Sequence, residues 1–200
     1  FLAPTNWATF ENGENYCVSG IYNGATETQT FLDGELQATN TLSVSDISGR
    51  VFPEFSLVNA FQDSVIEPFR GKLYNLVFST DTSYGNRVRL EGWSAWNMPT
   101  VPTLAAGHPF RNAAPTVEWV PSDHADLVGW YDASDAATIT TVGNKVSEWK
   151  DKSSQQNHAT QGTDADRPTL QSNGLYFDND SLNITSRSLL TVFFVLDDVV

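Results

Sequence analysis

The chain of 200 residues is long enough for one domain of ordinary size or two small ones, and 40% hydrophobic residues suffice for a buried core. The formal net charge of −13 would repel phosphate backbones, so we expect no nucleic-acid partner. No apolar run reaches the roughly 18 residues that cross a bilayer, so we expect no membrane partner either.

The first predicted elements are a strand around Cys17 and a hairpin. Cys17 is the single cysteine, which excludes an intrachain disulfide and a cysteine-based zinc site. Its surroundings are typical of a strand, so we expect a buried thiol that acts as a small apolar group. Asp33 and Gly34 join two β-rich runs and predict a type I′ turn, because both central residues of that turn must accept a positive φ.

Short β-rich runs separated by Gly, Asn, Asp and Ser dominate the rest of the chain. Helical periodicity is limited to residues 86–96, and residues 135–138 are expected to form a single turn. The pattern predicts an all-β fold, an antiparallel β-sandwich with one or two short helices. The expected strands are residues 16–22, 28–32, 35–42, 54–58, 71–79, 175–177 and 189–196.

Two groups of sequence motifs lie on either side of a proline-bracketed segment, residues 113–121. The first group is LDG (32–34), GKLY (71–74), EGWSAW (91–96) and LAAGHPF (104–110). The second group is LVGWYDASD (127–135), VSEWKDKS (146–153), NHA (157–159), RP (167–168) and LYFD (175–178).

The first group resembles the C-terminal half of concanavalin A-like lectin/glucanase jelly rolls, in the laminin-G-like form found in phage and bacterial surface proteins. The second group resembles the N-terminal half of the same family. The resemblance implies a jelly-roll sandwich. It divides the chain into residues 1–115, the C-terminal half of one jelly roll; 116–121, a linker; and 122–200, the N-terminal half of a second or complementing jelly roll.

Half a sandwich leaves an unpaired sheet edge, which is unfavourable, and two arrangements follow. In one, the sequence is a window cut from a longer tandem protein. In the other, the two halves pair with each other or with neighbouring chains. We favour the window, because the sequence ends within an expected strand, at residues 197–200.

Catalytic patterns are missing from the sequence. Glucanases of this superfamily carry two Glu residues with an Asp between them on one strand, and no E-x-D-x-E pattern occurs here. A Gly-x-Ser-x-Gly elbow and a phosphate loop are also absent. His108, His124 and His158 lie far apart without a metal-ligand spacing, and His108 is expected to be structural. We therefore expect no catalytic residues and no enzymatic activity.

The candidate glycan-binding residues lie in and after the polar loop 79–86. Tyr84 and Asp81 are the best candidates for exposed contacts, because loops carry function more often than strands do. Trp93 is a further candidate, because flat aromatic faces suit pyranose rings. Asn86, at the end of the loop, completes the set. Packing competes with binding for Trp93, Trp96, Trp130 and Trp149, because each Trp buries a large apolar area.

We expect no cofactor; the resemblance implies calcium as the alternative. Asp132 and Asp135 are the candidate ligands, and Asp178 with Asp180 are a second pair. Against metal binding, the 132–135 segment resembles a structural turn in which Asp side chains cap backbone amides.

These observations predict a non-enzymatic virion structural protein of a phage, either a capsid decoration protein or a tail fibre. Its partners would be other virion proteins, copies of itself and cell-surface glycans, and its location the virion or the extracellular space. The alternative is a carbohydrate-binding module of a secreted bacterial surface protein, because fold alone does not separate the two.

Overall fold

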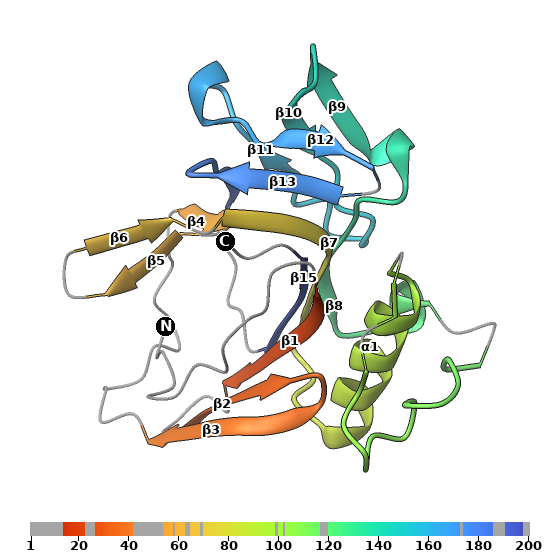
Figure 1. Cartoon of the computed structure of the whole chain (residues 1–200). Helices are drawn as coiled ribbons and strands as arrows, with labels where there is room; N and C mark the ends of the chain where they lie inside the picture. The colour runs from red at the N-terminus through yellow and green to blue at the C-terminus, as the bar shows by residue number, and fades with distance from the viewer. Residues whose placement is uncertain are drawn as a thin grey trace.

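A computed structural model describes residues 14–22, 27–41, 54–57, 59–62, 65–68, 70–98, 100–101, 103–116, 120–172, 174–185 and 191–197. The described part is mostly antiparallel β-strand with a single α-helix, which confirms the all-β prediction (Figure 1). Some of the predicted features lie outside the described residues. These are the strand ends at 42, 58 and 189–190, the linker residues 117–119 and the end of the sequence at 198–200.

The strands are short and their bounds follow the predicted runs closely where a run was predicted. They are β1 (Asn15–Tyr22), β2 (Glu27–Leu32), β3 (Glu35–Thr41), β4 (Glu54–Leu57), β5 (Asn59–Gln62), β6 (Val65–Pro68), β7 (Arg70–Ser79), β8 (Leu127–Asp132), β9 (Ile139–Val142), β10 (Lys145–Trp149), β11 (Ala159–Thr160), β12 (Thr169–Gln171), β13 (Gly174–Asp178), β14 (Leu182–Thr185) and β15 (Thr191–Asp197).

The predicted hairpin turn joins β2 to β3. Asp33 and Gly34 have φ angles of 50° and 83°, as a type I′ turn requires. A Cβ on Gly34 would lie 2.4 Å from the His108 ring, so this turn also needs glycine for space. Asp33 accepts a hydrogen bond from the backbone amide of Ala105 through its carbonyl oxygen, at 2.8 Å. The hairpin therefore docks against the segment that carries His108.

Strands from before and after residues 116–121 share one sheet. β15 lies between β1 and β7, and β7 pairs along its other edge with β13 and then with β8 (Figure 1). All of these pairs are antiparallel. The sheet thus divides at β7, with β8 at one end of the strand and the β13–β12–β10–β11–β14–β4 series at the other. The segments 1–115 and 122–200 pair with each other here; their assignment to halves of lectin-like jelly rolls stays a prediction.

The main hydrophobic core also draws on both segments. Leu73, Leu76 and Phe78 of β7 pack with Trp149 and Phe177, which come from after the linker. Trp149 and Phe177 are completely buried, and Tyr131 contacts Trp149 with ring centroids 5.5 Å apart. Burial of a large aromatic side chain stabilises the fold by roughly 2–3 kcal/mol, so neither segment would keep this core without the other.

The helix α1 (Tyr84–Trp96) covers β1 and β15. It begins two residues before the predicted 86–96 because Ser83 caps it, accepting a hydrogen bond from Asn86 N at 3.3 Å. Trp93 packs edge-on against Trp130, with centroids 5.6 Å apart. Its 13 residues are too few and too polar to cross a bilayer, and the described residues hold no longer helix.

The remaining helical pieces are single turns: η1 (Pro121–Asp123), η2 (Ala136–Thr138) and η3 (Asp164–Asp166). The second of these is the turn predicted at residues 135–138.

The hairpin turn contains a carboxyl group whose protonation should change stability. Burial raises the pKa of Asp33 from its usual 3.8 to about 6, although the hydrogen bond from Cys17 N opposes the shift. The neutral form favours the folded state, so its contribution is complete below pH 3.8 and is lost as pH rises through 6.

Asp33→Asn should remove this pH dependence, because asparagine keeps the acceptor for Cys17 N and tolerates the positive φ. We expect the variant to gain about 1–2 kcal/mol over the parent between pH 4 and pH 7, after a discount for partial exposure. Urea unfolding at both pH values measures the difference. Equal differences at pH 4 and pH 7 would contradict the assignment.

Candidate functional site

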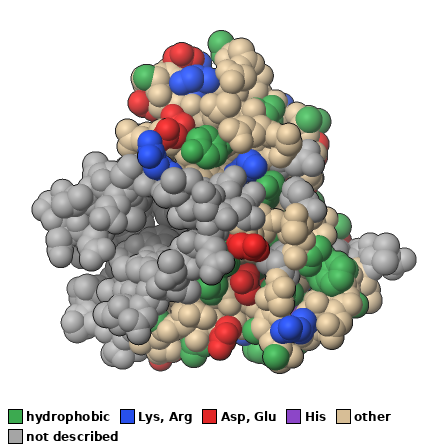
Figure 2. Space-filling view, in the orientation of Figure 1, with side chains coloured by type: hydrophobic (Ala, Val, Ile, Leu, Met, Phe, Trp, Pro, Cys, Tyr) green, Lys and Arg blue, Asp and Glu red, His purple; other side chains and the backbone are tan. Residues whose placement is uncertain are grey.

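The described surface shows no large patch of one side-chain type that would mark a binding site. On the described part of the face in Figure 2, acidic, basic and hydrophobic side chains are interspersed with polar ones. The large hydrophobic side chains that are exposed, Leu36, Tyr84, Val101 and Val142, come from separate elements of the described chain. A candidate site therefore has to be built from individual side chains.

One group of such side chains lies where β7 ends and β8 begins. Ser79 pairs with Leu127, so the chain leaving β7 runs beside the chain that enters β8. Thr80 fixes the two together by donating its backbone N–H and its hydroxyl to the carbonyl oxygen of Asp126, at 2.9 Å and 3.3 Å. We call Asp81, Tyr84, His124 and Asp126 the β7–β8 site.

The loop from β7 to α1 is held by its own polar side chains. Asp81 Oδ1 accepts from Ser83 N at 2.8 Å, and Asp81 Oδ2 accepts from Ser83 Oγ at 3.1 Å. The Asn86 amide donates to the Asp81 carbonyl oxygen at 2.8 Å and to Ser79 Oγ at 3.2 Å. Asn86 is buried, so its side chain supports the loop from beneath.

The four predicted glycan-binding residues therefore divide into two pairs. Tyr84 is 63% exposed, and its ring lies 5.4 Å from the guanidinium carbon of Arg87. Asp81, in the loop before the helix, is half-buried. Trp93 and Asn86 are buried, and Trp93 packs against Trp130. The structure leaves Tyr84 and Asp81 open to a ligand and places the other two inside the protein.

His124 and Asp126 join Asp81 in a group that sequence spacing did not predict. Each of the three side chains offers one ligand atom, and these atoms all lie within 4.8 Å of one another. His124 Nε2 is 3.6 Å from Asp81 Oδ2. Asp81 lies more than forty positions before His124 and Asp126, so the three residues form no sequence motif. Only the pairing of β7 with β8 brings them together.

Asp132 and Asp135, the predicted calcium ligands, both contact a positive side chain. Lys152 Nζ lies 3.1 Å from Asp132 Oδ2 and 2.9 Å from Asp135 Oδ2. The hydrogen bond from Lys152 lowers the pKa of Asp135. The other carboxylate oxygens accept from Ser134 N and Ala137 N, which confirms the predicted capping turn. The ammonium group of Lys152 occupies the position between the two carboxylates and supplies one positive charge there.

The second predicted pair is also engaged. Asp178 forms an ion pair with Arg70 at 2.6 Å, and Asp180 Oδ2 accepts from Asp178 N at 3.0 Å.

A buried ionic group lies under α1. Glu91 is completely buried, and one nitrogen of Arg87 donates to both of its carboxylate oxygens at 2.7 Å. Ser19 donates to Glu91 Oε1, and His108 Nε2 lies 3.2 Å from Oε2. His108 Nδ1 accepts from Phe110 N, which leaves the proton on Nε2 for Glu91. His108 is thus structural, as expected.

Comparisons with protein-family models, curated proteins and solved structures found no match.

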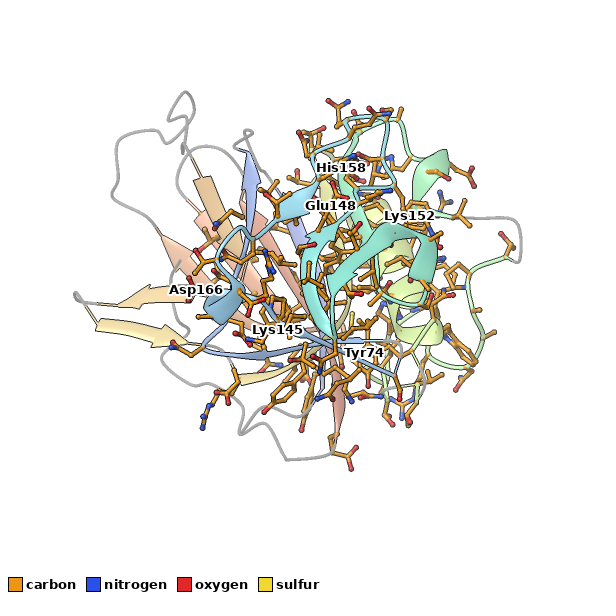
Figure 3. The ribbon with its side chains drawn as sticks, turned by 90° about the horizontal axis from the view of Figure 1, so that it is seen from above. Tyr74, Lys145, Glu148, Lys152, His158 and Asp166 are labelled. Carbon is orange, nitrogen blue, oxygen red and sulfur yellow. The ribbon has the colours of Figure 1, made fainter. Side chains whose placement is uncertain are left out.

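The WKDKS and NHA motifs form a second buried polar centre, around Asp151. Its carboxylate accepts four hydrogen bonds of 2.7–2.9 Å, from the backbone amides of Trp130, Ser153 and Asn157 and from the Ser153 hydroxyl. Lys152 and His158, labelled in Figure 3, come from the same segment. His158 Nδ1 accepts from Asp151 N at 3.2 Å. The bond from Trp130 N ties the segment after β10 to β8, and the other bonds hold that segment together, which is a structural role.

Proposed function

We propose that the chain is a concanavalin A-like jelly-roll module of a phage virion, non-enzymatic, that decorates a capsid or builds a tail fibre and attaches to host-surface glycans through the β7–α1 loop. Two features support the jelly roll. The sheet divides at β7 into β8 and the β13–β12–β10–β11–β14–β4 series. Side chains of both parts meet in one core. The phage context is supported by the sequence resemblance.

The single observation that carries glycan attachment is the exposure of Tyr84. Its ring is 63% exposed on a helix start that is anchored by the Ser83 cap and the Asn86 amide. A fixed aromatic face loses little conformational entropy when a pyranose ring stacks on it. Asp81, in the same loop, offers a carboxylate as an acceptor for sugar hydroxyl groups.

Tyr84→Ala should weaken binding to any glycan that the chain recognises by about tenfold or more, because the stacking surface is removed. A glycan array identifies the ligand, and titration of that glycan measures the loss. Val142→Ala is the matched control, since Val142 is 58% exposed and lies on β9. Equal binding by parent and Tyr84→Ala would rule out this site.

Two further outcomes separate the parts of the proposal. A chain that binds no glycan on the array would remove attachment and leave the structural virion role. A purified particle preparation without this polypeptide would remove the virion role and favour the alternative, a carbohydrate-binding module of a secreted bacterial surface protein.

A further inference from the structure

We infer that Asp81, His124 and Asp126 bind a divalent transition-metal ion, for which Zn²⁺ is the best match. One imidazole nitrogen and two carboxylate oxygens converge within 4.8 Å. Imidazole favours Zn²⁺ over Ca²⁺ and Mg²⁺, which prefer oxygen ligands throughout. Three protein ligands with a remaining open position are a common zinc arrangement. The inference does not depend on glycan binding.

The spacing of one pair of ligand atoms fits an ion between them. His124 Nε2 and Asp81 Oδ2 are 3.6 Å apart, which exceeds the normal length of a hydrogen bond. Two ligands of a tetrahedral zinc ion, each bonded at about 2.0–2.1 Å, lie about 3.4 Å apart. The observed distance is therefore closer to that of two ligands of one ion than to that of a hydrogen bond.

His124 supplies an independent observation. Its Nε2 atom is shielded from solvent and has no hydrogen-bond partner among the described residues. A buried polar nitrogen without a partner destabilises the folded state. The nitrogen faces the Asp81 carboxylate across 3.6 Å, which is beyond the length of a hydrogen bond. A cation between the two groups satisfies both.

The fold holds the Asp81 carboxylate and the backbone of Asp126 in place before any ion binds. Ser83 holds the Asp81 carboxylate, and Thr80 holds the backbone of Asp126. The Asp126 carboxylate itself makes no hydrogen bond to a described residue and is exposed, so it can turn toward the ion. The acidic pair Asp132 and Asp135 differs, because both carboxylates contact the ammonium group of Lys152.

The test is calorimetric titration of the full chain with Zn²⁺, with the variants Asp126→Asn and His124→Gln. We expect saturable binding of one ion, weakened about 10–100-fold or more in each variant. Asp123→Asn is the matched control, because Asp123 is an exposed neighbour that lies outside the cluster. Asp126→Asn is the variant least able to disturb folding, and circular dichroism verifies it.

A second measurement locates the ion. In a sample labelled with ¹⁵N at histidine, Zn²⁺ should shift the Nε2 signal of His124 and leave those of His108 and His158 in place. Saturable binding lost in Asp126→Asn, together with that shift, supports the site. No zinc binding, equal affinity in Asp126→Asn, or an unchanged His124 signal would each overturn it.

Discussion

Replacing Asp151 with alanine is expected to lower the free energy of unfolding by about 3–5 kcal/mol, because three buried backbone amides lose their acceptor at once. Trp130 N, Ser153 N and Asn157 N all donate to this carboxylate, at 2.8–2.9 Å. Few positions in the described chain carry so many bonds on one side chain. Urea unfolding monitored by tryptophan fluorescence measures the loss.

Two further variants make this prediction specific. Asp151→Asn keeps one acceptor oxygen but turns an NH₂ group toward the amide donors, so we expect a loss of similar sign and smaller size. Asp164→Ala is the control: its ion pair with Arg167 is at the surface, where such pairs contribute about 0–1 kcal/mol. A loss below about 1 kcal/mol for Asp151→Ala would mean that water replaces the carboxylate.

Replacing Glu91 with leucine is expected to cost about 3–5 kcal/mol, because Arg87 keeps its buried charge without a counter-ion. The side chain of Arg87 is 8% exposed and that of Glu91 is fully buried. The guanidinium also lies 3.8 Å from the centre of the Phe31 ring, which leaves it little freedom to move into solvent. Urea unfolding measures the cost.

The double variant Arg87→Met, Glu91→Leu separates the ion pair from simple packing. It removes both charges and keeps most of the volume, so it should be more stable than Glu91→Leu alone. Ser19 and His108 would still lose their acceptor, and we expect only partial recovery. Additive losses in the double variant would show that the charge of Arg87 is not the cause.

Helices and strands were predictable wherever a local sequence pattern specifies them. The run 71–79 is rich in apolar and aromatic residues, and β7 occupies Arg70–Ser79. The helix at 86–96 differs from α1 only at its start, where the Ser83 cap adds two residues. By contrast, β11 is two residues long and exists because Ala159 and Thr160 pair with β10 and β14, a partnership without a local pattern.

The candidate site was predictable in part. Tyr84 and Asp81 were identified because they lie in a polar loop, and both reach the surface. Trp93 was a candidate because it is aromatic, yet its neighbours bury it. The type of a residue does not show which distant side chains pack against it. His124 and Asp126 gave no signal of a site, since their partner Asp81 belongs to a distant segment.

By itself, the sequence determined the all-β character, the Asp33-Gly34 turn, the approximate bounds of α1 and the burial of Cys17. These depend on φ preferences, alternation and capping, which act over a few residues. The tertiary structure alone decided that β15 lies between β1 and β7, that Lys152 occupies the predicted calcium ligands, and that His124 faces Asp81. Strand register is set by the burial of whole faces against distant partners, so it cannot be derived from neighbouring residues.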